Sequence, residues 1–262
     1  MKLDGKDPIK EWGLIPTVGQ SHPLTPDIRT NTMEIPGMEG VWDFGSEWGV
    51  RTFTIPFGKV DHDKYTMQQQ LRSFVAFLLD PFGRPREIKL TFDYEPDKYY
   101  MVKLNDRIDP ERLFFTSEFE VSFVANKPQA NFIVPSNEIS WDADIPIMND
   151  VLWGMGETEI KILYPRIINL VYSGTKAIRA GFRLQGTGNN VTISANGKTM
   201  SFGNMRGETY QVDGETYTIF QNGEDRLTNT EFIELVHGSN QVKINGSNLN
   251  LTFTEQLTYQ FI

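Results

Sequence analysis

The residues that could perform catalysis or bind a metal do not occur at the spacings such sites require. The three histidines, His22, His62 and His237, lie far apart, and no H-E-x-x-H motif is present. Asp61-His62-Asp63 has ligand-type side chains, but a solvated helix start explains it better. The chain has no cysteine, which excludes thiol catalysis, disulfides and Cys-based zinc sites. We therefore expect no catalytic residues, no metal and no cofactor.

Two further patterns carry chemistry in other proteins. Gly186-Thr187-Gly188-Asn189-Asn190 has glycines like a phosphate-binding loop, but it lacks the Lys-Ser/Thr pair and a following helix. We interpret it as a hairpin loop. Closely spaced carboxylates occur at 142–144 and 157–159, whereas a glycosidase needs two acids roughly 5–9 Å apart in space, which sequence does not establish. The sequence therefore gives only weak support for a cell-wall hydrolase. The chain also lacks the G-x-S-x-G motif of a serine hydrolase.

Three aromatic residues of the second half, Trp141, Trp153 and Tyr217, have the type that stacks on sugar rings. A β-sandwich can offer a concave face for such a site, so a carbohydrate-binding module is the alternative function. For each of the three residues we nevertheless expect a place in the hydrophobic core.

Composition favours a globular, strand-rich protein. Of 262 residues, 39% are hydrophobic and 12% aromatic, and aromatic residues favour strands. The net charge of −9 argues against wrapping nucleic acid, which requires a basic face. The first 13 residues have no apolar region typical of a signal peptide, and no apolar run approaches the ~20 residues needed to span a bilayer. We expect no membrane insertion.

The first half predicts one helix on an antiparallel sheet. Residues 51–57 alternate as a strand, and Pro56 within them favours an edge or a strand end. Apolar residues recur at helical spacing from Asp63 to Leu79, with Asp61 or Asp63 as the N-cap. Further strands are predicted at 87–94, 99–104 and 118–124, with Glu95-Pro96-Asp97 as a turn.

The second half predicts a β-sandwich. Residues 127–165 contain four prolines and read as a connector with extended pieces such as 138–141. Strands are expected at 178–184, 249–253 and 257–261. Three dipeptides are typical of hairpin turns: Asn196-Gly197, Asp213-Gly214 and Asn245-Gly246. We divide the chain into residues 1–130, a β-rich domain with one helix, and residues 131–262, a connector plus a β-sandwich.

Residues 36–49 form the most unusual segment, because they concentrate glycines and large aromatic residues. Two hypotheses account for this segment. It forms either an exposed arm whose aromatic residues are buried by a neighbouring subunit, or a loop folded over its own core. The candidate contact residues are Pro36, Gly37, Gly40, Trp42, Phe44, Gly45 and Trp48.

The same region carries a resemblance to a known family. Several segments occur in an order that resembles the distal tail (Dit) proteins of siphophages infecting Gram-positive bacteria. They are Met33–Gly45, the strand at 51–57, the helix at 71–78, Glu95-Pro96-Asp97-Lys98-Tyr99-Tyr100, Asp109-Pro110-Glu111 and the strand at 119–123. No single piece is specific, but together they cover about residues 29–130. Met38 departs from the pattern, since that position is usually basic.

The resemblance implies a structural baseplate-hub protein of the virion tail tip, assembled in the host cytoplasm and not an enzyme. Its first domain would form a homo-oligomeric ring, usually a hexamer, and its second would be galectin-like. The ring would join the major tail protein to the tail-associated fibre or lysin protein, and to a receptor-binding protein or host glycan. DNA would pass through the channel without specific binding, which the acidic net charge suits. In this setting the carbohydrate-binding alternative becomes a host-adhesion module.

Overall fold

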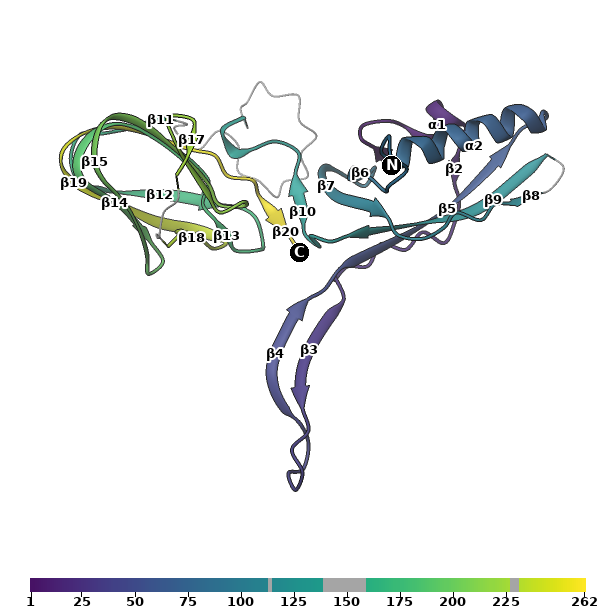
Figure 1. Ribbon diagram of the computed structural model, residues 1–262, viewed down its shortest axis with the longest axis horizontal. Coiled ribbons are helices and arrows are strands. Elements are labelled where there is room, and N and C mark those ends of the chain that lie inside the picture. Colours follow the sequence, from purple (N-terminus) through teal and green to yellow (C-terminus); the bar gives the residue numbers. More distant parts are fainter. Residues whose placement is uncertain (113–114, 139–158, 227–230) are drawn as a thin grey trace. The chain divides into compact units, whose positions relative to one another are not determined.

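The computed structural model describes residues 1–112, 115–138, 159–226 and 231–262, and it divides into two compact units. Unit 1 comprises Met1–Ala130 with Ile262, and unit 2 comprises Asn131–Phe261. Both are built mainly from antiparallel strands (Figure 1). The mainly β fold predicted from the sequence is therefore confirmed.

Unit 1 contains a sheet in the order β1-β6-β7-β9-β5-β2, with β8 added to β9. At its centre β5 and β9 pair over ten residues, from Arg51↔Ala125 to Val60↔Thr116. The side chains of β5 and β9 alternate between buried and more exposed positions, because one face of the sheet is covered. The strand bounds are β1 (Lys2–Leu3), β2 (Ile15–Pro16), β5 (Arg51–Val60), β6 (Ile88–Phe92), β7 (Glu95–Leu104), β8 (Glu111–Arg112) and β9 (Thr116–Ala125).

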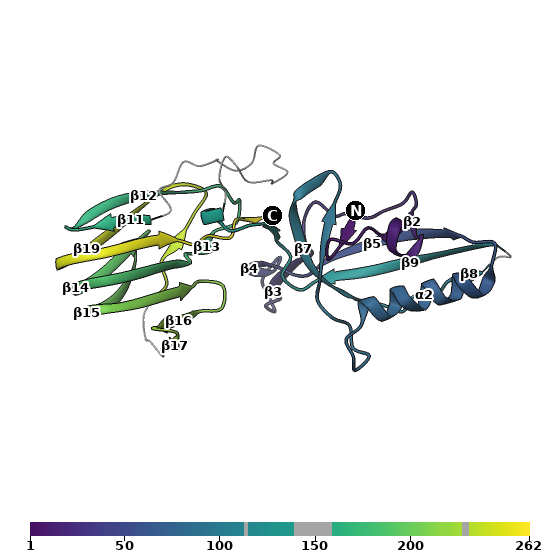
Figure 2. The ribbon, with the colours of Figure 1, turned by 90° about the horizontal axis from the view of Figure 1, so that it is seen from above.

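Helix α2 (Lys64–Leu78) covers one face of this sheet (Figure 2). It buries Met67, Leu71, Phe74 and Leu78, the apolar stripe that its sequence periodicity predicts. The side chain of Asp63 caps the helix by accepting from the backbone N–H groups of residues 65 and 66. A second helix, α1 (Pro8–Trp12), was not predicted, although Asp7-Pro8 is a helix-start signal that could have revealed it.

The ring of Phe74 joins helix and sheet in one aromatic cluster. Its centroid lies 5.2 Å from that of Trp12 in α1, 5.9 Å from Phe57 in β5 and 6.4 Å from Phe119 in β9. All four side chains are buried, so this cluster is the core between α2 and the sheet.

Two local predictions in unit 1 were wrong. The turn between β6 and β7 is Asp93-Tyr94, and Glu95-Pro96-Asp97 already belongs to the returning strand. Pro56 lies within β5 and not at its end. The sheet tolerates it because its carbonyl faces the two-residue strand β2, accepting from the N–H of Thr17, so its missing N–H removes no bond to β9.

Unit 2 is a β-sandwich formed by long, curved strands. β19 pairs with β14 on one side; on its other side its first half pairs with β12 and its last part with β11. The sheet continues as β14-β15-β16-β17, and β13 pairs separately with β18. The bounds are β10 (Ala130–Phe132), β11 (Glu159–Ile162), β12 (Arg166–Tyr172), β13 (Ile178–Arg179), β14 (Phe182–Ala195), β15 (Lys198–Asp213), β16 (Thr218–Gln221), β17 (Glu224–Asp225), β18 (Glu234–Leu235), β19 (Gly238–Glu255) and β20 (Gln260–Phe261).

Glycine-containing segments account for most of the wrong predictions in unit 2. Residues 186–190 are not a hairpin loop but the interior of β14, where the pairing register shifts at bulges. Gly186 has φ +133°, and a Cβ there would lie 2.1 Å from the carbonyl oxygen of Asn250. Asn245-Gly246 likewise lies within β19. In both places glycine permits a bulge rather than a turn.

The remaining turn predictions in unit 2 are partly right and partly wrong. Asn196-Gly197 forms the predicted two-residue hairpin, with both φ angles positive. After Asp213, however, a four-residue loop precedes β16. Asn222-Gly223 forms a hairpin that was missed, although its sequence carried the signal.

Three strand predictions also need correction. The strand expected at 178–184 is interrupted at Ala180-Gly181 between β13 and β14. At the end of the chain only Gln260–Phe261 forms a strand. Of the extended piece expected at 138–141, Glu138 instead closes the 3-10 helix Ser136–Glu138, and the rest lies outside the described residues.

Candidate functional site

Residues 28–48 form a two-stranded hairpin, here called the arm, that projects from the sheet of unit 1 (Figure 1). It consists of β3 (Ile28–Met33) and β4 (Trp42–Trp48), and every residue of both strands is exposed. The arm contains all seven candidate contact residues. The competing hypothesis, a loop folded over its own core, is wrong, because the arm's side chains are not buried by the rest of the chain.

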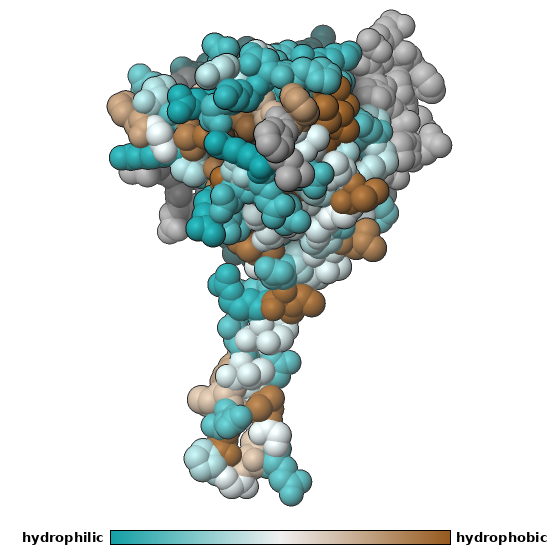
Figure 3. Space-filling model, turned by 90° about the vertical axis from the view of Figure 1, so that its right-hand side faces the viewer, coloured by the Kyte–Doolittle hydropathy of each residue, from teal (hydrophilic) through white to brown (hydrophobic). Residues whose placement is uncertain are grey.

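Apolar side chains occupy both faces of the arm. Ile28 pairs with Trp48 and Met33 pairs with Trp42. Residues 28 and 33 are five positions apart on one strand, so these two apolar pairs point to opposite faces. Figure 3 shows apolar side chains along the protruding arm, separated by polar ones. A two-stranded ribbon has no core of its own, which makes both faces available to a partner.

A bulge in β4 directs one aromatic side chain outward. Between the pairs Thr30↔Ser46 and Thr32↔Asp43 the register shifts, so that Phe44 and Gly45 lie opposite the single residue Asn31. Gly45 has φ +99°, which explains the need for glycine, and its N–H donates to the Asp43 carboxylate at 2.8 Å. Phe44 is 62% exposed, more than either tryptophan of the arm.

The tip of the arm is a turn that contains Pro36, Gly37 and Gly40. Both glycines have positive φ, +87° and +84°, and the N–H of Met38 donates to the carbonyl of Ile35. Met38 is exposed. Where the resemblance leads one to expect a cation, the tip therefore presents another apolar side chain.

The arm carries more acid than base. Its charged residues are Arg29, Glu34, Glu39, Asp43 and Glu47, and four acids with one base give a net charge of −3. Arg29 and Glu47 lie opposite each other across the two strands, so the remaining carboxylates are not balanced within the ribbon.

The base of the arm is fixed to unit 1 by backbone bonds and a buried arginine. The N–H of Asp27 donates to the carbonyl of Val50 at 3.0 Å, and the N–H of Gly49 donates to the carbonyl of Asp27 at 2.7 Å. Next along the chain, the buried Arg51 donates to the hydroxyl of Tyr100 at 3.0 Å and to the carbonyl of Leu24. The position where the arm leaves the sheet is therefore defined, even though the arm itself is uncovered.

A histidine cluster that sequence reasoning missed lies in the same unit. The ring of His22 stacks on Phe92 at 4.4 Å, while its nitrogens lie 2.6 Å from the Tyr94 hydroxyl and 3.2 Å from the Tyr100 hydroxyl. Burial lowers the pKa of His22, although Glu95 opposes the change. Burial also raises the pKa of Tyr94 to about 12. Burial therefore favours the neutral imidazole, which packs among the rings of Phe92, Tyr94 and Tyr100.

The remaining candidates are scattered. Tyr217 does not belong to the core as expected: it is 56% exposed, has φ +57°, and lies over the Arg179 guanidinium at 4.1 Å. Trp141 and Trp153 lie outside the described residues, as do residues 142–144 and 157–158. Among the described residues no group of acidic or histidine side chains has metal-binding geometry, and no helix is long and apolar enough to cross a membrane.

Comparison with known proteins gives a family match for the first unit. Residues 8–125 match the model of the phage tail protein RIFT-related domain. The match lies within unit 1 and covers most of it. The match includes the arm, α2 and the central strands of the sheet. No curated protein matches the chain.

The fold also resembles a solved tail protein over nearly its full length. The Dit protein (gp 19.1) of phage SPP1, described as a paradigm of the hub adsorption apparatus of phages that infect Gram-positive bacteria, is 13% identical with a TM-score of 0.71. The alignment covers 99% of this chain and 98% of that one. Two structures of the phage p2 baseplate in its activated conformation, one with Sr and one with Ca, are 8% and 9% identical, with TM-scores of 0.41 and 0.42 and coverage of 97% of this chain and 93% of theirs. Those scores are too low to add to the argument.

Proposed function

We propose that the protein is a distal tail protein of a siphophage that infects Gram-positive bacteria. In this role copies of unit 1 close into a ring, expected to be a hexamer, at the end of the tail tube. The tail-domain family of unit 1 and the fold shared with the Dit protein of phage SPP1 support this role. The ring would join the major tail protein to the tail-associated fibre or lysin protein and to the receptor-binding apparatus, and DNA would pass through its channel.

The observation that carries the proposal is the uncovered arm. A hairpin with apolar residues on both faces is only marginally stable in water, and exposed apolar surface of this kind marks a site of protein association. A projecting element on one side of a subunit that binds a different surface of the next subunit makes a head-to-tail contact. Such contacts close into rings when the rotation between neighbours permits. The candidate contact residues Trp42, Phe44 and Trp48 supply the aromatic anchors that dominate interface energies.

The test is the absolute mass in solution, measured by light scattering on a size-exclusion column, with negative-stain images of the same peak. The proposal expects a hexamer, or a multiple of one, with a central hole. A strict monomer at high protein concentration would contradict self-assembly through the arm.

A second candidate function is glycan binding by unit 2. The observation that favours it is Tyr217, an exposed aromatic residue held in a left-handed backbone conformation and packed on Arg179 and Phe232. Strained aromatic residues on a surface are often functional. A glycan array comparing the unsubstituted protein with Tyr217→Ala tests it: binding lost only in the variant supports a host-adhesion role, and no binding by either protein rejects it.

A further inference from the structure

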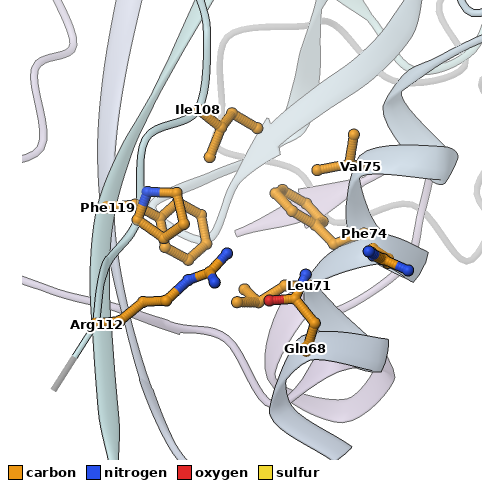
Figure 4. Close-up of a pocket in the computed structure, with 9 residues that line it drawn as sticks. Gln68, Leu71, Phe74, Val75, Ile108, Arg112 and Phe119 are labelled. Atoms are coloured by element: carbon orange, nitrogen blue, oxygen red, sulfur yellow. The ribbon is translucent and has the colours of Figure 1, made fainter. Parts of the chain in front are cut away.

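Unit 1 contains a hollow between α2 and the β8–β9 pair, here called the groove (Figure 4). Its floor is apolar, formed by Leu71 and Phe74 of the helix and Phe119 of β9, with Val75 and Ile108 at its sides. Its volume is about 230 Å³, and a cavity of roughly 150 Å³ already holds a benzene ring. The groove can therefore accept one aromatic side chain.

The polar lining of the groove is basic. Arg72 of α2 and Arg112 of β8 line it, and both side chains are exposed. Arg112 pairs with Ser117, which lies two residues from Phe119 and so on the same face of the sheet. Glu111, Glu118 and Glu120 point to the opposite face by the same alternation. The Asp109 carboxylate lies 3.8 Å from the Arg107 guanidinium, which offsets its charge.

We propose, on the basis of the ring proposed above, that this groove receives Phe44 from the arm of a second copy of the chain. Phe44 is the most exposed aromatic residue of the arm and stands out at the β4 bulge. It is flanked by Asp43 on an arm whose net charge is −3. An apolar ring beside carboxylates complements an apolar floor beside two arginines, so shape and charge select the same occupant.

The absence of cysteine from the sequence permits a direct test. Two differently tagged full-length proteins, Ser46→Cys and Ile108→Cys, are co-expressed, purified and oxidised, and disulfide-linked heterodimers are detected on a non-reducing gel. Ser46 is exposed and lies two residues from Phe44 on β4, so this substitution leaves Phe44 in place. The matched control replaces the Ile108→Cys protein with Glu120→Cys, whose substituted position lies on β9 but on the face away from the groove. We expect a heterodimer between Ser46→Cys and Ile108→Cys, and none between Ser46→Cys and Glu120→Cys.

A second variant does not depend on disulfide geometry. Arg112→Glu reverses a charge at the groove without changing the core, so we expect the chain to fold. Its rings should dissociate at protein concentrations at which the unsubstituted rings persist. Glu111→Lys, on the opposite face of the same strand, serves as the control and leaves ring formation unchanged. Both are read by light scattering.

The outcomes separate the groove from the ring. If rings form, but the 46–108 cross-link is absent and Arg112→Glu does not weaken the rings, the arm binds another surface. That result would overturn the groove proposal and leave the proposed function intact. A cross-link equally strong at position 120 would also overturn it. An unsubstituted protein that forms no ring at all counts against the proposed function first, and the groove proposal falls with it.

Discussion

Replacing Phe44 by serine separates the stability of unit 1 from its assembly. The side chain is 62% exposed and belongs to a hairpin that contributes nothing to the core of the sheet. Its removal should change the free energy of unfolding by no more than about 0.5 kcal/mol, the usual range for surface substitutions. The melting temperature of the dissociated chain should therefore stay close to that of the unsubstituted protein.

The effect on assembly should be much larger. Truncating an aromatic anchor at the centre of an interface costs on the order of 2 kcal/mol or more. Since 1.4 kcal/mol corresponds to a tenfold change in Kd, each subunit contact should weaken by roughly 30-fold. Every contact in a ring loses the same side chain, so the ring should dissociate at a concentration where the unsubstituted ring persists.

The assay is light scattering over a dilution series, with thermal unfolding of the same samples followed by circular dichroism. Phe82→Ser is the matched control, because Phe82 is 86% exposed and lies in unit 1 but outside the arm. The reasoning is refuted if Phe44→Ser assembles at the same concentration as the unsubstituted protein, or if Phe82→Ser weakens assembly equally.

Three further predictions concern stability. Phe74→Ala should destabilise unit 1 by about 3–5 kcal/mol in urea denaturation, because its buried ring contacts both Trp12 and the sheet; a loss below about 1 kcal/mol would show that the cluster is not a shared core. Asn240→Leu should destabilise unit 2 by on the order of 3 kcal/mol in the same measurement. The reason is that the buried amide donates to the carbonyls of Val236 and Gly238 and accepts from Asn196. An unchanged free energy of unfolding would contradict this role of the amide. The folded-state pKa of His22 lies below its ordinary value of 6.5, so below that pH the unfolded chain binds a proton that the folded chain does not. The stability contributed by His22 should therefore be fully present above about pH 6.5 and fall as the pH drops below it. His22→Gln should flatten this pH dependence in thermal unfolding.

Local sequence was sufficient where a single element determines its own pattern. The period of Met67, Leu71, Phe74 and Leu78, together with Asp63 as a cap, predicted α2 to within about one residue at each end, because the helix buries one stripe and its first N–H groups need an acceptor. Alternation predicted the core of β5 and β9 in the same way. The concentration of glycine and aromatic residues in 36–49 suggested an exposed arm as one of two hypotheses, and the structure shows the exposed hairpin.

Sequence was insufficient where a distant strand decided the conformation. Gly186 and Gly246 have turn-type sequences, but each lies within a long strand, because pairing of β14 with β15 and β19 provides hydrogen-bond partners that a local turn would lack. The His22 cluster joins residues more than 70 positions apart, so no local sequence pattern indicates it.

The sequence by itself determined α2 and the alternating strands β5 and β9, and it showed which short stretch carries apolar residues without a helical or buried-strand pattern. Only the tertiary structure decided that this stretch is covered by nothing in its own chain, and that an apolar groove with two arginines remains open beside α2. The physical reason is that residue type fixes how strongly a side chain avoids water, whereas the packing of distant elements fixes which of those side chains are left exposed to it.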